Sequence, residues 1–198
     1  MINFPEKLQQ GFSLIELLII MAITVLVGTT FVLNFRAAST NAAARHQLSS
    51  VMIADIRNAQ SLAVSGGKVN NPSSGREENP CGYGLHYVNS AAYYIYAGMP
   101  TGSCSGANRN FQDGTDIIVE TRTIGNPNMI LSGSAPGGVF YDVFFEPPDP
   151  KVYLNNDANL STAPTATDIY VVRLGQVCPG GDCTIVSVHK SGAINLSN

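Results

Sequence analysis

An apolar run from Phe12 to Leu33 is the feature that most constrains how this chain can fold. As a helix the run would be about 33 Å long at ~1.5 Å per residue, which matches a hydrocarbon core of ~30 Å. Its polar interruptions are Ser13, Glu16, Thr24, Thr29 and Thr30. Hydroxyl side chains can bond back to the helix backbone, so they are tolerated. The carboxylate of Glu16 cannot do so, and a charge at membrane depth indicates a functional role.

A secretory signal peptide and a plain single-pass anchor are two alternatives for this run. A signal peptide has a positive charge before its apolar core, as Lys7 does here. The run is long for such a core, however, and only Gly28-Thr29-Thr30 and Ala37-Ala38-Ser39 approach a small-residue cleavage site. A single-pass anchor fits the length equally well. It has no need of Glu16 inside the bilayer, so neither alternative accounts for this residue.

The string Gly11-Phe12-Ser13-Leu14-Ile15-Glu16 resembles the type IV prepilin signal, with a short polar leader before it. The resemblance implies that a prepilin peptidase cleaves after Gly11 and that Phe12 becomes the N-methylated mature N-terminus. It further implies that Glu16, the fifth mature residue, pairs with the N-terminal amine of a neighbouring subunit during assembly. A buried carboxylate is much less costly when it is paired in this way. Many pilins carry a helix-kinking proline where this chain has Leu33.

Composition favours a folded or membrane-attached protein, because 44% of residues are hydrophobic and only 13% are charged. The net charge of −3 provides no general basic surface for nucleic acid or anionic lipid.

Four cysteines, Cys81, Cys104, Cys178 and Cys183, follow the apolar run. Export of this region would make disulfides plausible, and four cysteines allow three pairings. The short, turn-rich loop from Cys178 to Cys183 favours that pair together with Cys81–Cys104, against free thiols or a zinc site that includes His189.

The helical pattern continues beyond the apolar run. One apolar stripe recurs at spacings of three and four: Ala44, Leu48, Val51, Met52, Ile56, Ala59, Leu62 and Ala63. Polar residues fall largely elsewhere: Arg45, Gln47, Ser49, Asp55, Arg57 and Asn58. Gly66-Gly67 supplies the stop, so we expect a helix from Ser13 to about Ser65 whose second half packs on a globular domain.

Strand-like segments follow a polar loop that is expected over Lys68–Pro80. Tyr83–Tyr87 and Ala92–Tyr96 flank a turn and predict a hairpin. Later candidate strands are Asp116–Ile124, Val139–Phe145, Ile169–Leu174, Thr184–His189 and Ala193–Leu196, with loops expected over Gly98–Thr115 and Glu146–Thr167. Strands at this spacing without intervening helices indicate antiparallel structure. The predicted fold class is therefore α+β, with a long N-terminal helix packed on an antiparallel sheet or sandwich.

This order of elements resembles the GspH/FimT group of minor pseudopilins and minor pilins. The matching pieces are the helix end Asp55–Ala63, the strand Cys81–His86, and the terminal segment Ile185–Ile194. The resemblance implies a leader over 1–11, a membrane and filament-core helix over 12–35, an amphipathic helix over 36–66 and a β-rich domain over 67–198 outside the cytoplasm. Its implied fold is that of a type IV pilin.

No catalytic motif emerges from the sequence. His46, His86 and His189 lie in no nucleophile, phosphate-loop or metalloprotease pattern. The acidic pairs Glu77-Glu78 and Asp113/Asp116 are expected to be solvated charges in loops. The sequence therefore predicts a protein that is not an enzyme, with no metal site and no cofactor.

The resemblance implies a structural subunit of a type IV pilus or of a type II secretion pseudopilus. Its expected partners are other pilins or pseudopilins, the prepilin peptidase and methyltransferase, the inner-membrane assembly platform and the cytoplasmic membrane. The alternative is a pilus-tip protein whose loops 98–115 and 146–167 bind DNA or a surface. A tail with Lys190, and Arg173 upstream, gives little electrostatic support for DNA, and Ala193 replaces the arginine expected beside Gly192.

Overall fold

A computed structural model describes residues 13–100, 102–148, 151–155 and 164–197, with only the helical backbone for 33–38. The chain divides into two compact units, 1–40 and 41–198. Helix α1 (Leu14–Ser65) contributes to both of them. Its residues within the first unit are solvent-exposed wherever their side chains are described.

The second unit contains eleven strands in three sheets, as far as the described residues extend. Every strand pairing is antiparallel, as the sequence predicts. A five-stranded sheet has the order β5-β4-β3-β7-β8, a four-stranded sheet has the order β11-β10-β9-β6, and β1 pairs with β2. The bounds are β1 (Val69–Asn71), β2 (Arg76–Glu78), β3 (Gly82–Asn89), β4 (Ala92–Gly98), β5 (Ile117–Thr123), β6 (Met129–Gly133), β7 (Val143–Glu146), β8 (Lys151–Leu154), β9 (Ala166–Arg173), β10 (Cys183–His189) and β11 (Ile194–Ser197).

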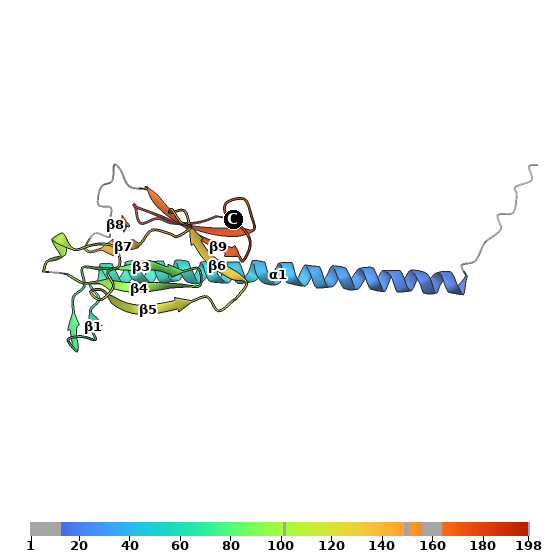
Figure 1. Cartoon of the computed structure of the whole chain (residues 1–198), viewed down its shortest axis with the longest axis horizontal. Helices are drawn as coiled ribbons and strands as arrows, with labels where there is room; N and C mark the ends of the chain where they lie inside the picture. The colour runs from blue at the N-terminus through green and yellow to red at the C-terminus, as the bar shows by residue number, and fades with distance from the viewer. Residues whose placement is uncertain (1–12, 101, 149–150, 156–163, 198) are drawn as a thin grey trace, which may run out of the picture. The chain divides into compact units, whose positions relative to one another are not determined.

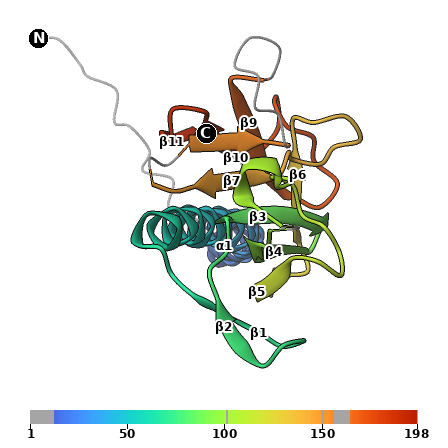
Figure 2. The same cartoon turned by 90° about the vertical axis from the view of Figure 1, so that its left-hand side faces the viewer.

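A single core joins the later part of α1 to both large sheets. Met52, Ile56 and Ala59 of the helix are fully buried among side chains of β3, β4, β7, β9 and β10. Figure 1 shows β5 on one side of this part of α1 and β7 and β8 on the other, and Figure 2 shows β10 on the same side as β7. Burial of such apolar side chains is the main stabilising contribution, at about 1.5–3 kcal/mol for each large residue.

The helix is more completely enclosed than a single stripe predicts. Val51, an expected stripe residue, is 41% exposed. Arg45, Ser49 and Asp55 are buried, although they were expected to lie off the apolar stripe. Each of these three residues has a partner that offsets part of its loss of water, although Arg45 Nε makes no hydrogen bond within the described structure. Arg45 forms an ion pair with Asp182, Ser49 donates to the His46 carbonyl at 3.0 Å, and Asp55 binds side chains of two strands. The prediction of one apolar stripe was therefore wrong in these positions.

The expected loop over 68–80 is also wrong, because it contains the hairpin of β1 and β2. Figure 2 shows this hairpin extending away from the two larger sheets. The turn is closed by the backbone amide of Gly75, which donates to the Asn71 carbonyl at 2.8 Å. Gly75 itself has a positive φ of 65°. Apart from Val69, which packs against the core, the two strands carry only polar side chains, so the hairpin has no hydrophobic alternation that the sequence could reveal.

Three further strand assignments differ from the expectations. β8 lies within the expected loop 146–167, and β6 was not predicted. The expected strand Val139–Phe145 is shorter in the structure, where β7 begins only at Val143. Gly137 and Gly138, both with positive φ, precede it and turn the chain, so Val139 forms only an isolated bridge with Ala135.

Glycine at position 84 permits close packing of β3 against its neighbours. A Cβ added there would lie 2.6 Å from the Val143 carbonyl oxygen and 2.8 Å from the Tyr96 ring. We expect Gly84→Ala to lower the free energy of unfolding by about 1–3 kcal/mol, the usual cost of overpacking a core. Urea unfolding of the full chain in detergent measures the change. Gly125→Ala is the matched control, because nothing lies within 4 Å of its added Cβ; equal losses in both variants would contradict the role assigned to close packing.

Candidate functional site

Glu16 lies in the first turn of α1 and is surrounded in sequence by exposed apolar side chains. Its amide donates to the Ser13 carbonyl at 3.0 Å, which places it at the start of the helix. Among the described residues, no cation lies within ion-pairing distance of its carboxylate. Gly11 and Phe12, the expected cleavage site and mature N-terminus, lie outside the described residues. The role of Glu16 in assembly stays a prediction.

The threonines of this segment satisfy their hydroxyl groups locally. Thr24 donates to the carbonyls of Ile20 and Met21, both at 3.0 Å. Thr29 and Thr30 make equivalent bonds one turn back, at 2.8–3.0 Å. This confirms the expectation that hydroxyl residues remain compatible with an apolar environment. Glu16 is therefore the one polar side chain between Leu14 and Val32 that the helix does not itself satisfy.

The described part of the chain contains one helix long and apolar enough to cross a membrane. It covers Leu14–Val32, with a mean hydropathy of 2.4 and none of it buried within the structure. Such a surface is stable only in lipid or against other protein. The segment can therefore occupy a bilayer and, outside it, needs a protein partner.

Comparison with protein families favours the prepilin interpretation of this segment over a secretory signal peptide or a plain anchor. Residues 7–32 match the prokaryotic N-terminal methylation motif. The match supports a type IV prepilin-like protein. Neither the curated proteins nor the solved structures include a significant match to this prepilin-like chain. The motif implies processing by a prepilin peptidase, anchoring in a membrane and assembly with other pilins.

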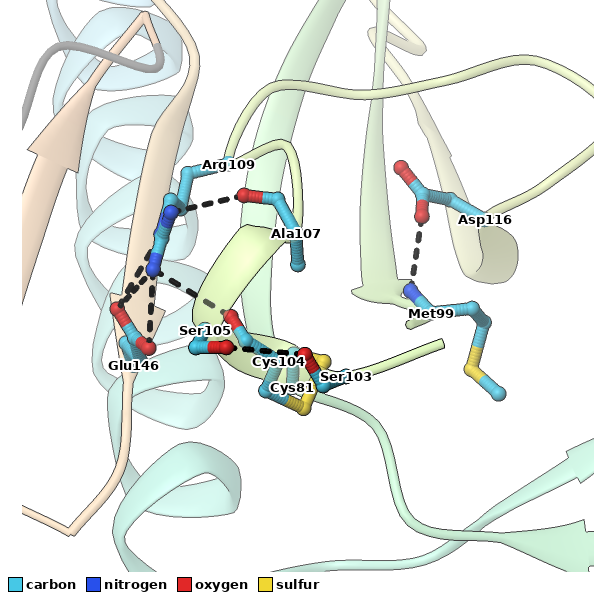
Figure 3. The surroundings of a disulfide bond; sticks show 9 residues. All are labelled: Cys81, Met99, Ser103, Cys104, Ser105, Ala107, Arg109, Asp116 and Glu146. Carbon is cyan, nitrogen blue, oxygen red and sulfur yellow. Dashed lines mark hydrogen bonds and ion pairs between the residues drawn. A yellow bond between two sulfur atoms is a disulfide. The ribbon is translucent and has the colours of Figure 1, made fainter. Parts of the chain in front are cut away.

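Two disulfides occur in the globular part of this prepilin-like protein. Cys81 pairs with Cys104, with 5.2 Å between Cα atoms, and Cys178 pairs with Cys183. This is the pairing that the sequence favoured. The first bond ties the residue before β3 to the short 3₁₀ helix η1 (Cys104–Gly106), as Figure 3 shows. The second closes the turn before β10.

The two disulfides are expected to differ in their effect on stability. Cross-links stabilise mainly by restricting the unfolded chain, so the effect grows with the sequence separation. The separations of 23 and 5 residues give about 3.5 kcal/mol for Cys81–Cys104 and about 2 kcal/mol for Cys178–Cys183. Denaturant unfolding of the two double Cys→Ala variants, in the full chain, measures both values. A larger loss for the Cys178–Cys183 variant would contradict this ordering.

The segment between β4 and β5 is held by more than its disulfide. Arg109 donates to both oxygens of Glu146 at 3.2–3.3 Å and to the Ala107 carbonyl at 2.8 Å (Figure 3). Its guanidinium also lies 4.8 Å from the centre of the Tyr153 ring. Bidentate pairs of this kind combine specific geometry with strength. The expected loop 98–115 is therefore fixed to β7 and β8 as well as to β3.

Asp116 helps to fix the same segment, which corrects its interpretation as a solvated charge. Its carboxylate accepts the amides of Met99 and Gln112, both at 2.8 Å, and Figure 3 shows the first of these bonds. Burial raises the pKa of Asp116 above its ordinary value, and the two amide bonds oppose this only in part. Glu78, also expected in a loop, lies in β2 and accepts the Ser74 hydroxyl at 2.6 Å.

The structure brings together one pair of titratable side chains that sequence analysis did not connect. His86 Nδ1 lies 2.8 Å from Asp142 Oδ1, although the residues are 56 positions apart. The only signal in the sequence was a charged residue, Asp142, inside an apolar segment.

The other two histidines do not join this pair: His46 is exposed, and His189 Nε2 lies 3.1 Å from Asn195 Nδ2. Within the described ranges, no group of three or more His, Cys, Asp and Glu side chains is placed to hold a metal ion.

Proposed function

We propose that this prepilin-like chain is a minor pilin or pseudopilin of the GspH/FimT group. Its function would be to assemble into, or initiate, a type IV pilus or a type II secretion pseudopilus. The observation that carries the proposal is the methylation motif over 7–32, with Glu16 five residues after Gly11. The order of one N-terminal helix followed by antiparallel sheets supports it.

The proposed mechanism has three steps. Prepilin peptidase cleaves after Gly11, and the new amine of Phe12 is methylated. Exposed apolar side chains of Leu14–Val32 hold the subunit in the membrane until assembly. The Glu16 carboxylate then pairs with the Phe12 amine of a neighbouring subunit, a pairing that is favourable where water is excluded.

The proposed orientation places the globular part outside the cytoplasm. Two disulfides support it, because such bonds persist in oxidising compartments and are rare in the cytosol. The inner-membrane assembly platform would be the partner that moves the processed subunit from the membrane into the filament. Peptidase, methyltransferase and the other pilins complete the proposed set of partners.

Mass spectrometry of the chain from native membranes tests this proposal. We expect loss of residues 1–11, one added methyl group on Phe12, and recovery of the same species in sheared filaments or overproduced pseudopili. The control is a strain without prepilin peptidase, in which the full-length chain should stay in the membrane. A chain cleaved after Ala38 instead would support a secretory signal peptide and overturn the proposal.

The described surface does not favour DNA binding. The C-terminal strands β10 and β11 contain neither Lys nor Arg, and Arg173 lies at the end of β9. Phosphate contacts require several cations, each of which contributes to the salt dependence of binding. We therefore place assembly ahead of the alternative of a DNA-binding tip protein.

A further inference from the structure

A pocket of about 520 Å³ lies beside the His86–Asp142 pair, remote in sequence from the methylation motif. It is formed by β3, by the segment between β6 and β7, and by Asn155 after β8. Its volume falls within the range of small-molecule sites, which combine aromatic walls with a few oriented polar groups. Assembly through the N-terminal helix makes no use of it.

His86 is held in one orientation at this pocket. A carboxylate oxygen only accepts, so Nδ1 donates to Asp142 and Nε2 is the ring nitrogen left to bind a ligand. The Phe111 ring packs on the imidazole, with 4.7 Å between ring centres. The second oxygen of Asp142 accepts the Phe111 amide at 2.7 Å. Within the described residues, no hydrogen bond to Nε2 is present.

Asn155 provides a second oriented polar group. Its φ of 54° lies in the left-handed region, which few residues other than glycine adopt. Its amide donates to the Asp142 carbonyl at 2.8 Å, which fixes this conformation beside the pocket. The Asn155 side chain supplies one hydrogen-bond donor group and one acceptor.

Aromatic side chains form much of the wall. Tyr87 and Tyr141 are half-buried, so part of each side chain remains accessible. Phe140 supports Tyr87 in an edge-to-face contact with 5.3 Å between ring centres. The Tyr141 amide donates to the buried Thr167 hydroxyl at 3.1 Å, which fixes the backbone at that position. The partly exposed rings provide apolar surface with a polar edge.

Charge selects the class of ligand. Among the described residues that line the pocket, none is Lys or Arg, so a phosphate or carboxylate has no cation to bind. The Asp142 side chain is only 9% exposed and each of its oxygens already accepts one hydrogen bond, so little of the carboxylate is accessible to an ammonium group. The geometry points to a neutral saccharide as the ligand of this pocket, with ring C–H groups on Tyr87 and Tyr141 and hydroxyls on His86 Nε2 and Asn155.

Saturation-transfer NMR on the full chain tests this inference. The detergent must lack a sugar headgroup, so lauryldimethylamine oxide is suitable. The probes are the methyl glycosides of glucose, galactose, mannose and N-acetylglucosamine, each at about 5 mM to detect weak binding, with glucose 6-phosphate as the charged comparison. We expect saturation transfer to at least one neutral glycoside and less to glucose 6-phosphate.

Two variants and one matched control locate the binding. Asn155→Gly keeps the left-handed backbone conformation accessible and keeps the backbone amide, and it removes only the side-chain amide. The fold should therefore persist. This substitution should weaken binding about fivefold, the effect of one lost hydrogen bond, and Tyr141→Ala should weaken it at least as much. Tyr170→Ala, on β9 and outside the pocket, should bind as the unmodified chain does. Absence of transfer to every neutral probe, stronger transfer to the phosphate, or equal binding by all variants would overturn the assignment.

Discussion

Glu16→Ala is expected to abolish incorporation of the chain into filaments while it leaves the chain in the membrane. Under the proposed mechanism, the substitution leaves the Phe12 amine of a neighbouring subunit without its partner where water is excluded. Removing one partner of a buried ion pair costs about 3–5 kcal/mol. Because about 1.4 kcal/mol corresponds to a factor of ten, incorporation should fall about 100-fold or more. Quantitative immunoblotting of sheared filaments against total membranes measures the ratio.

Membrane insertion should not suffer, because alanine is less costly in a bilayer than a carboxylate. Glu16→Gln separates charge from shape, since it keeps the size of the side chain and a hydrogen-bonding group. It should incorporate nearly as poorly as Glu16→Ala if pairing of charges drives assembly. Thr24→Ala is the matched control, because the Thr24 hydroxyl bonds only to its own helix among the described residues. Normal incorporation of Glu16→Ala would eliminate the proposed role.

Local patterns predict much of this fold. Apolar spacing predicts the helix, which the structure has at Leu14–Ser65, and alternating aromatic residues predict the hairpin of β3 and β4. The turn-rich sequence between Cys178 and Cys183 predicts the second disulfide. In each case the signal lies within a few residues of its structural consequence. Strands with polar faces, such as β1 and β2, lack this signal and were missed.

Contacts between distant segments are harder to predict. Asp55 and Arg122 are 67 positions apart, and His86 and Asp142 are 56 apart. Helical spacing indicates only that Asp55 lies off the apolar stripe, which suggests solvent. Strands β4 and β5 of the five-stranded sheet cover that side of the helix, and nothing in the helix sequence reports their presence. A polar residue in an otherwise apolar segment is the remaining signal, and it does not identify the partner.

The contact that sequence analysis missed at Asp55 gives the largest stability effect expected of a single substitution outside the disulfides. The side chain is 6% exposed and accepts the Tyr93 hydroxyl at 2.6 Å. Arg122 donates to both its oxygens, at 2.9 and 3.0 Å. Burial raises the pKa of Tyr93, and its bond to Asp55 raises it further, so the hydroxyl remains a donor. Asp55 thus joins α1 to strands β4 and β5.

Asp55→Ala should lower the free energy of unfolding of the globular part by about 3 kcal/mol. The substitution leaves the buried Tyr93 hydroxyl unsatisfied, at about 1–3 kcal/mol, and removes a charge pair. The Arg122 side chain is 39% exposed, so water recovers part of that second loss and the expected cost stays at the low end for a buried pair. Urea unfolding of the full chain, followed by near-ultraviolet circular dichroism of its eight tyrosines, measures the change.

Glu120→Ala provides the matched control, because Glu120 also binds Arg122, at 2.7 Å, but is 41% exposed. Pairs at that exposure contribute less than about 1 kcal/mol. Tyr93→Phe should cost about 1 kcal/mol in the unmodified chain, but it should regain stability in the Asp55→Ala background, since it removes the hydroxyl that is left unsatisfied there. If Asp55→Ala cost no more than Glu120→Ala, burial of this carboxylate would not be what stabilises the attachment of the helix to the sheet. An unchanged cost of Tyr93→Phe in both backgrounds would show that the two side chains act independently.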